Sequence, residues 1–202
     1  MRKKGPKMNK MLTTIALVLS LGYNGTAEAA KLGSYVNNEG NVILTLEGEI
    51  NQGDAKGLQS IINKARWNNR SVIAIRLSSP GGNMMEGIHI ADVVNDNKLA
   101  TVVVKDAMCA SACFLAFAAG HEKYASARSS IGVHGASESN GKESDNSRSA
   151  TIIMAKILNM MHVPHRIIGE MVTTPPNQMI WLKMPDMREW DVVVTGLDQK
   201  GQ

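Results

Sequence analysis

Runs of aliphatic and β-branched residues alternate along the chain with segments that have helical periodicity. Short apolar runs bounded by glycine, serine or asparagine predict strands. These runs cover residues 41–48, 71–77, 100–104, 130–133 and 190–194. Between them, apolar residues recur every three or four positions, which predicts helices. The expected helices begin at Asp54, Met85 and Ser111, and a further amphipathic helix covers residues 150–161.

Strands that alternate with helices are typical of βαβ units, whose strands are parallel and whose crossovers are right-handed. The sequence therefore predicts an α/β fold. A chain of 202 residues, 44% of them hydrophobic, is long enough to bury one core. Residues 135–147 are rich in serine, asparagine, glycine and charged residues, which predicts a mobile loop after the fourth strand.

The first 29 residues have the organisation of a secretory signal peptide. Five basic residues precede an apolar run from Met11 to about Tyr23, and Ala27-Glu28-Ala29 provides a small-residue cleavage site. The apolar run is shorter than the roughly 20 residues that span a bilayer, so an uncleaved anchor is the less favoured interpretation. We therefore expect residues 1–29 to be removed, and the domain of residues 30–202 to reach the periplasm or the medium without a stable membrane anchor.

Removal of this segment changes the charge balance. It contains five of the 22 basic residues and one of the 18 acidic residues, which leaves 17 of each sign in the remaining chain. The net charge of +4 therefore belongs to the predicted signal peptide. The remaining composition favours neither nucleic acid nor an anionic membrane as a partner.

Three expected loops at strand ends contain residue types suited to acyl transfer. Ser79–Gly82 (SPGG) is flexible enough to expose backbone N–H groups, which can stabilise an oxyanion. Ser111 lies between small residues before an apolar helix, and His134 ends an apolar strand. A histidine with a pKa of about 6.5 can serve as a general base. Each feature also has a structural explanation: a tight turn, a helix N-cap, or a histidine satisfied by the backbone.

Together, these motifs resemble the Clp protease proteolytic subunit and its relatives in the crotonase-like superfamily. The strand ending in SPGG, the Cys109–Cys113 (CASAC) elbow, Ala119-Gly120 and the strand ending in His134 occur in the same order. The resemblance covers residues 41–134 well and extends loosely to Gly196. It implies a single-domain spiral of βαβ units, and a homo-oligomer by analogy.

The resemblance also implies roles for individual residues. Ser111 would be the nucleophile and His134 its general base, with the backbone N–H groups of Gly82 and Ala112 forming the oxyanion hole. The family's catalytic aspartate has no carboxylate at the matching place, where the sequence reads Pro176–Leu182 (PNQMIWL). Three interpretations stay open, in this order: Asn177 or Gln178 orients the imidazole, the site works as a Ser–His dyad, or Asp186 supplies the carboxylate.

Cys109 and Cys113 flank Ser111 at a separation of four residues. In an oxidising compartment a pair of cysteines predicts a disulfide, provided that Cys109 lies before the helix begins. The alternative is that both are small apolar residues packed around a functional turn.

The favoured function is an exported serine peptidase that hydrolyses short or unfolded peptides without ATP, metal or another cofactor. The first alternative is a non-catalytic peptide-binding or assembly module of the same fold. A Ser–Lys hydrolase would need a lysine in the pocket, for which Lys105 is the nearest candidate in the sequence. A crotonase that acts on acyl-CoA is the least favoured, because exported compartments lack CoA.

Overall fold

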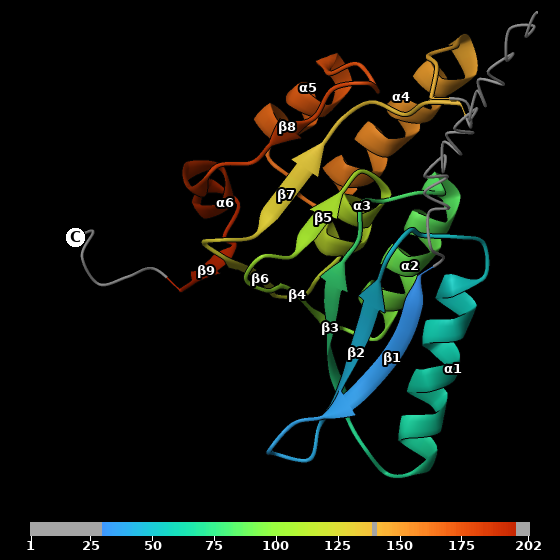
Figure 1. Cartoon of the computed structure of the whole chain (residues 1–202), viewed down its shortest axis with the longest axis vertical. Coiled ribbons are helices and arrows are strands. Elements are labelled where there is room, and N and C mark those ends of the chain that lie inside the picture. Colours follow the sequence, from blue (N-terminus) through green and yellow to red (C-terminus); the bar gives the residue numbers. More distant parts are fainter. Residues whose placement is uncertain (1–29, 139–140, 197–202) are drawn as a thin grey trace, which may run out of the picture.

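The structure is a computed structural model that describes residues 30–138 and 141–196 (Figure 1). The predicted signal peptide, residues 1–29, lies outside the described residues.

A sheet of mostly parallel strands forms the centre of the molecule. It has six strands in the order β1-β2-β3-β4-β6-β9. All neighbouring strands pair in parallel except β1 and β2, which are antiparallel. The strands are β1 (Lys31–Val36), β2 (Val42–Glu47), β3 (Val72–Ser78), β4 (Ala100–Val103), β6 (Lys123–Ser126) and β9 (Val193–Thr195).

A second, smaller sheet includes the strands that lead into Ser111 and His134. Its three strands are β5 (Met108–Ala110), β7 (Ser130–Val133) and β8 (Ile180–Trp181), with β7 between the other two. An isolated parallel bridge between Ser79 and Cys109 joins the end of β3 to β5. This bridge brings the SPGG loop and the serine elbow together.

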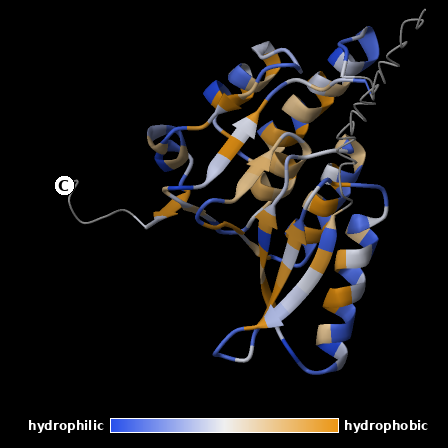
Figure 2. Cartoon of the chain, in the orientation of Figure 1, coloured by the Kyte–Doolittle hydropathy of each residue, from blue (hydrophilic) through white to orange (hydrophobic). Residues whose placement is uncertain are grey.

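In the described part of the chain six helices accompany these sheets. Apolar residues gather on the strands and on α3, whereas hydrophilic stretches lie on α1 (Figure 2). Every residue of α3 is buried, as expected for a helix that is apolar all round. Phe114 and Phe117 of α3 pack against Trp190. The centroid of the Trp190 ring lies 5.4 Å from that of Phe114 and 5.7 Å from that of Phe117. The helices are α1 (Asp54–Trp67), α2 (Met84–Asp96), α3 (Ala112–Ala118), α4 (Asp145–Met160), α5 (His165–Thr173) and α6 (Met184–Glu189).

The predicted α/β fold is confirmed, and most predicted elements occur within a few residues of their expected bounds. One boundary is wrong: α4 begins at Asp145, inside the segment 135–147 that was expected to be a loop. Ser144 caps the start of the helix: its hydroxyl oxygen accepts a hydrogen bond from the Ser147 N–H, and the Ser147 hydroxyl oxygen accepts one from the Ser144 N–H. Polar residues at this helix start resemble loop residues in the sequence, because serine and aspartate favour both.

The last strand is also displaced from its expected position. β9 begins at Val193, whereas Trp190 is the buried C-cap residue of α6. The short elements β5, β8 and α6 have too few residues to show a periodicity, so the sequence did not predict them. Along residues 30–138 and 141–196, no helix is both long and apolar enough to cross a bilayer.

Candidate active site

Ser111 occupies a sharp turn between β5 and α3. Its backbone has φ 55° and ψ −125°, a conformation that residues with a side chain rarely adopt and that costs about 1–3 kcal/mol. Two hydrogen bonds hold the turn: the Ser111 N–H donates to the Gly132 carbonyl at 3.1 Å, and the Phe114 N–H donates to the Ser111 carbonyl at 2.8 Å. Although Ser111 stands at the N-cap position, its side chain makes no capping hydrogen bond. The hydroxyl therefore does not cap the helix, which is the ordinary structural role of a serine at this position.

The SPGG loop lies directly against this turn. A Cβ atom placed on Gly81 would lie 2.7 Å from both the Ser111 Cβ and the Ala110 carbonyl oxygen. Gly81 also has φ 103°, which favours glycine. The Ser79 hydroxyl accepts a hydrogen bond from the Gly81 N–H at 3.0 Å, which stabilises the conformation of the loop. The motif is thus more than an ordinary tight turn, because side chains at Gly81 would displace the serine.

Two backbone N–H groups beside Ser111 are available to a ligand. The loop at Gly82 bridges to Ile50, where the Ile50 N–H donates to the Gly81 carbonyl and the Asn83 N–H donates to the Ile50 carbonyl. The Gly82 N–H takes no part in these hydrogen bonds and has no hydrogen-bond partner among the described residues. Ala112 is the first residue of α3, so its N–H has no partner within the helix.

His134 follows β7, the parallel neighbour of β5. The pairing sets Ala110 opposite Gly132, so the residues after both strands emerge at the same edge of the small sheet. Ser111, His134, Gly82 and Ala112 consequently line one cavity of about 590 Å³. Four residues that were singled out in three separate sequence motifs thus share a single cavity.

The His134 imidazole is partly withdrawn from water. Burial lowers its pKa below the ordinary 6.5, and the backbone of Gly135 acts in the opposite direction. Its Nδ1 atom is buried and has no hydrogen-bond partner in the part of the chain that the structure describes. A neutral ring at pH 7 can accept a proton. The described residues show no hydrogen bond between Ser111 Oγ and His134.

None of the candidates for a third catalytic residue reaches this histidine. Asn177 and Gln178 are exposed in the segment between α5 and β8, and neither lines the cavity. Asp186 is bound elsewhere: its carboxylate pairs with Arg166 and accepts the Lys183 N–H at 2.7 Å. Asp186 thus ties α6 to α5 and belongs to a structural ion pair.

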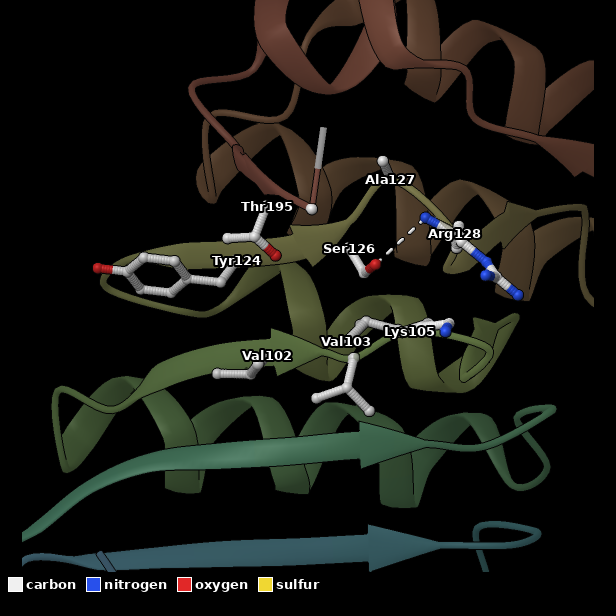
Figure 3. A pocket seen from close by; sticks show the side chains of 10 residues that line it. Val102, Val103, Lys105, Tyr124, Ser126, Ala127, Arg128 and Thr195 are labelled. Atoms are coloured by element: carbon white, nitrogen blue, oxygen red, sulfur yellow. Dashed lines mark hydrogen bonds between the residues drawn. The ribbon is translucent and has the colours of Figure 1, made fainter. Parts of the chain in front are cut away.

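Lys105 lies in a different cavity from Ser111. That cavity, of about 790 Å³, lies at the carboxyl ends of β4, β6 and β9, and Lys105 shares it with Ser126, Arg128 and Thr195 (Figure 3). No lysine is among the residues that line the Ser111 cavity. The geometry therefore favours histidine over lysine as the base for Ser111.

Cys109 and Cys113 are joined by a disulfide across the elbow. The Cα atoms are 5.2 Å apart, and both side chains are fully buried. Cys109 belongs to β5 and Cys113 to the first turn of α3, so the two cysteines are not on one regular helix. The bond spans the residue that carries the candidate nucleophile.

Several lining residues had no signal in the sequence. Met84 and Met154 form an apolar part of the wall, and Glu49 and Glu138 add carboxylates. A methionine in an amphipathic helix looks like any core residue, so only tertiary packing identifies it with the cavity. In residues 30–138 and 141–196 no three histidine, cysteine or acidic side chains gather as a metal site.

Comparison with known proteins assigns the chain to a family. The model of the Clp protease family matches residues 26–179. No curated protein sequence gives a significant match. Among solved structures, ClpP1 from Listeria monocytogenes superposes with a TM-score of 0.60 at 16% identity, covering 77% of this chain and 92% of that protein.

Two further structures are similar at the level of the fold. The ClpP catalytic domain from Plasmodium falciparum has a TM-score of 0.55 at 19% identity, with 73% of this chain and 81% of that one covered. A mutant of the 1510-N membrane-bound stomatin-specific protease has a TM-score of 0.57 at 20% identity, with 77% and 78% covered. The family match spans well over half of the chain and includes the loop, the elbow and the histidine strand: this chain belongs to the Clp protease family.

Proposed function

We propose that this chain is an exported serine peptidase in which Ser111 attacks the scissile carbonyl and His134 acts as the general base. Membership of the Clp protease family supports a peptidase in general. The observation that carries the proposed Ser111–His134 mechanism is the elbow. Ser111 has φ 55°, its side chain makes no helix-capping hydrogen bond, and it shares its cavity with the partly buried His134.

The proposed reaction uses groups that the described residues place around this cavity. The Ser111 hydroxyl transfers its proton to the neutral His134 imidazole while Oγ bonds to the carbonyl carbon. The carbonyl oxygen becomes an oxyanion, and the N–H groups of Gly82 and Ala112 donate hydrogen bonds to it. His134 then protonates the departing amine, and water hydrolyses the acyl-enzyme in a second round of the same steps.

We infer a Ser–His dyad without a third member. The buried Nδ1 of His134 has no partner among the described residues, Asn177 is exposed and Asp186 is paired with Arg166. A dyad lacks the carboxylate that would stabilise the imidazolium, so it predicts a slower enzyme than a complete triad. Substrate binding can also shorten a Ser–His contact, since catalytic hydrogen bonds often tighten only in the complex.

The proposed substrates are short peptides or unfolded segments. Export would remove the enzyme from ATP and therefore from an ATP-driven unfoldase, so the proposal includes ATP-independent hydrolysis. By analogy with the family fold we propose a homo-oligomer, which size-exclusion chromatography with light scattering would test. The proposed location is the periplasm or the medium, on the strength of the n-region, apolar run and Ala27–Ala29 site.

The decisive test is labelling with a fluorophosphonate probe. Purified residues 30–202 should label, Ser111→Ala should not, and His134→Ala should label at least about 100-fold more slowly, because loss of a general base costs about 10²–10⁴. Ser137→Ala is the matched control, since this serine lines the same cavity. Labelling that survives in Ser111→Ala, or is absent from the unaltered protein, would refute the nucleophile assignment.

A non-catalytic peptide-binding module is the second candidate. The absence of a Ser111–His134 hydrogen bond among the described residues and the unpartnered Nδ1 favour it. Such a module would bind unfolded peptides with the same affinity in the Ser111→Ala variant and would release no new amino termini. Export is tested separately: N-terminal sequencing of the protein from the periplasmic fraction should begin at Ala30.

A further inference from the structure

A buried disulfide brackets the candidate nucleophile and has no role in the proposed reaction. It joins the second residue of β5 to the second residue of α3, with Ser111 midway between them. Both cysteine side chains are completely buried, so the disulfide lies in the core next to the elbow. A bond in this place can act on the elbow itself.

Global stabilisation is a weak explanation for this bond. A disulfide restricts the unfolded chain by an amount that grows with the logarithm of the length of the loop that it closes, so the separation of only four residues places this contribution at the low end of its range. Its two ends are also held independently. Cys109 pairs with Ile131 in the small sheet, and α3 is buried along its whole length.

The elbow, by contrast, needs a local restraint. Ser111 has φ 55° and ψ −125°, and the side chain makes no hydrogen bond that stabilises this backbone. The backbone bonds from Ser111 to Gly132 and from Phe114 to Ser111 hold one side of the turn. Gly81 lies against the same turn, so closely that a Cβ atom on Gly81 would lie 2.7 Å from the Ser111 Cβ. Relaxation of Ser111 toward an ordinary conformation would therefore move its hydroxyl relative to both Gly82 and His134.

We propose that the Cys109–Cys113 disulfide is a positioning element that holds Ser111 in its reactive conformation, so that reduction disables the nucleophile without unfolding the domain. The inference rests on the proposed function for its catalytic readout. It would couple activity to an oxidising compartment, because the disulfide adds to the backbone hydrogen bonds the restraint that keeps Ser111 in its strained conformation.

The unaltered protein provides a clean test, because the whole sequence contains only these two cysteines. A water-soluble phosphine breaks the S–S bond: each sulfur gains an electron and a proton, and the phosphine becomes a phosphine oxide with an oxygen from water. Thiol counting verifies the reaction, with a low urea concentration added if burial slows it. Oxidised, reduced and reoxidised samples are then compared in the same buffer.

The expected result is at least a tenfold slower fluorophosphonate labelling of Ser111 in the reduced sample, and recovery on reoxidation. In peptide hydrolysis kcat should fall while KM changes less than about twofold, since the substrate walls are untouched. Circular dichroism should show a folded domain, and amide hydrogen exchange should accelerate in peptides covering residues 109–116. A purely structural bond would lower Tm without changing the labelling rate of the folded protein.

The inference would be overturned if the reduced protein contains two free thiols per chain and Ser111 is labelled as fast as in the oxidised protein. Cys109→Ser/Cys113→Ser is the second variant: it should behave as the reduced protein and should not respond to the phosphine. If the oxidised protein does not label at all, the proposed function fails, and hydrogen exchange still decides the positioning role. Unchanged exchange in residues 109–116 after reduction would then refute it.

Discussion

Gly87 offers the sharpest test of how the elbow is supported. It lies in the first turns of α2, where an alanine would ordinarily stabilise the helix by about 1 kcal/mol. Here, however, an added Cβ would lie 2.6 Å from the Ala112 carbonyl oxygen and 3.0 Å from the Ala112 Cβ. The methyl group must therefore push α2 away from the start of α3.

The expected outcome reverses the usual sign of this substitution. Overpacking a buried contact costs about 1–3 kcal/mol, which offsets or exceeds the gain in helix propensity. Gly169→Ala is the matched control, because Gly169 also lies in a helix and has no atom within 4 Å of the position of the new Cβ. Gly169→Ala should be more stable than Gly87→Ala by about 1–3 kcal/mol, at about 2–4 °C of Tm per kcal/mol for a domain of this size.

Activity should separate the two variants further. Displacement of Ala112 moves an N–H that we propose to bind the oxyanion, so kcat of Gly87→Ala should fall by about 10–100-fold. Gly169→Ala should retain its kcat. Thermal unfolding by circular dichroism and steady-state hydrolysis of a fluorogenic peptide measure the two effects. A Gly87→Ala protein as stable and as active as Gly169→Ala would refute the contact between α2 and the elbow.

Three further outcomes follow from the described contacts. Because burial lowers the pKa of His134 below 6.5, a pH profile of kcat/KM should rise to its plateau below pH 6.5. The Tm should fall as the pH is lowered from about 6.5 through the pKa of the folded state, and it should fall less in the His134→Gln variant. Asp186→Asn should lower Tm, through loss of its ion pair, but leave kcat within about threefold, as should Asn177→Ala; a tenfold loss in either would restore a third catalytic member. Trp190→Ala should destabilise the domain by about 3–5 kcal/mol in urea unfolding, because the ring is buried against Phe114, and a loss below 1 kcal/mol would contradict this packing.

The alternation of strands and helices was predictable from the sequence because it depends on local periodicity. A buried parallel strand reads as a short apolar run, as in residues 71–77, and a helix such as α1 repeats its apolar positions every three or four residues. The short elements β5, β8 and α6 could not be found this way. The start of α4 was missed because serine and aspartate favour helix starts and loops alike.

The candidate site was predictable only in its residues and their order. Ser111, His134, Gly82 and Ala112 emerged from local chemistry and from the resemblance to the Clp family. The sequence could not assign Asp186, since three elements (α4, α5 and β8) separate this carboxylate from the β7 strand before His134, and it pairs with whichever cation the fold brings to it. The structure pairs it with Arg166 of α5.

By itself, the sequence determined an α/β chain with a glycine loop, a serine elbow and a histidine, in this order, at the ends of strands. Tertiary structure alone decided that Gly81 abuts Ser111, that Met84 and Met154 wall the cavity, and that His134 Nδ1 has no partner among the described residues. The physical reason is range. Periodicity and turn chemistry act over a few residues, whereas these contacts join elements far apart in the chain and depend on strand register and helix packing.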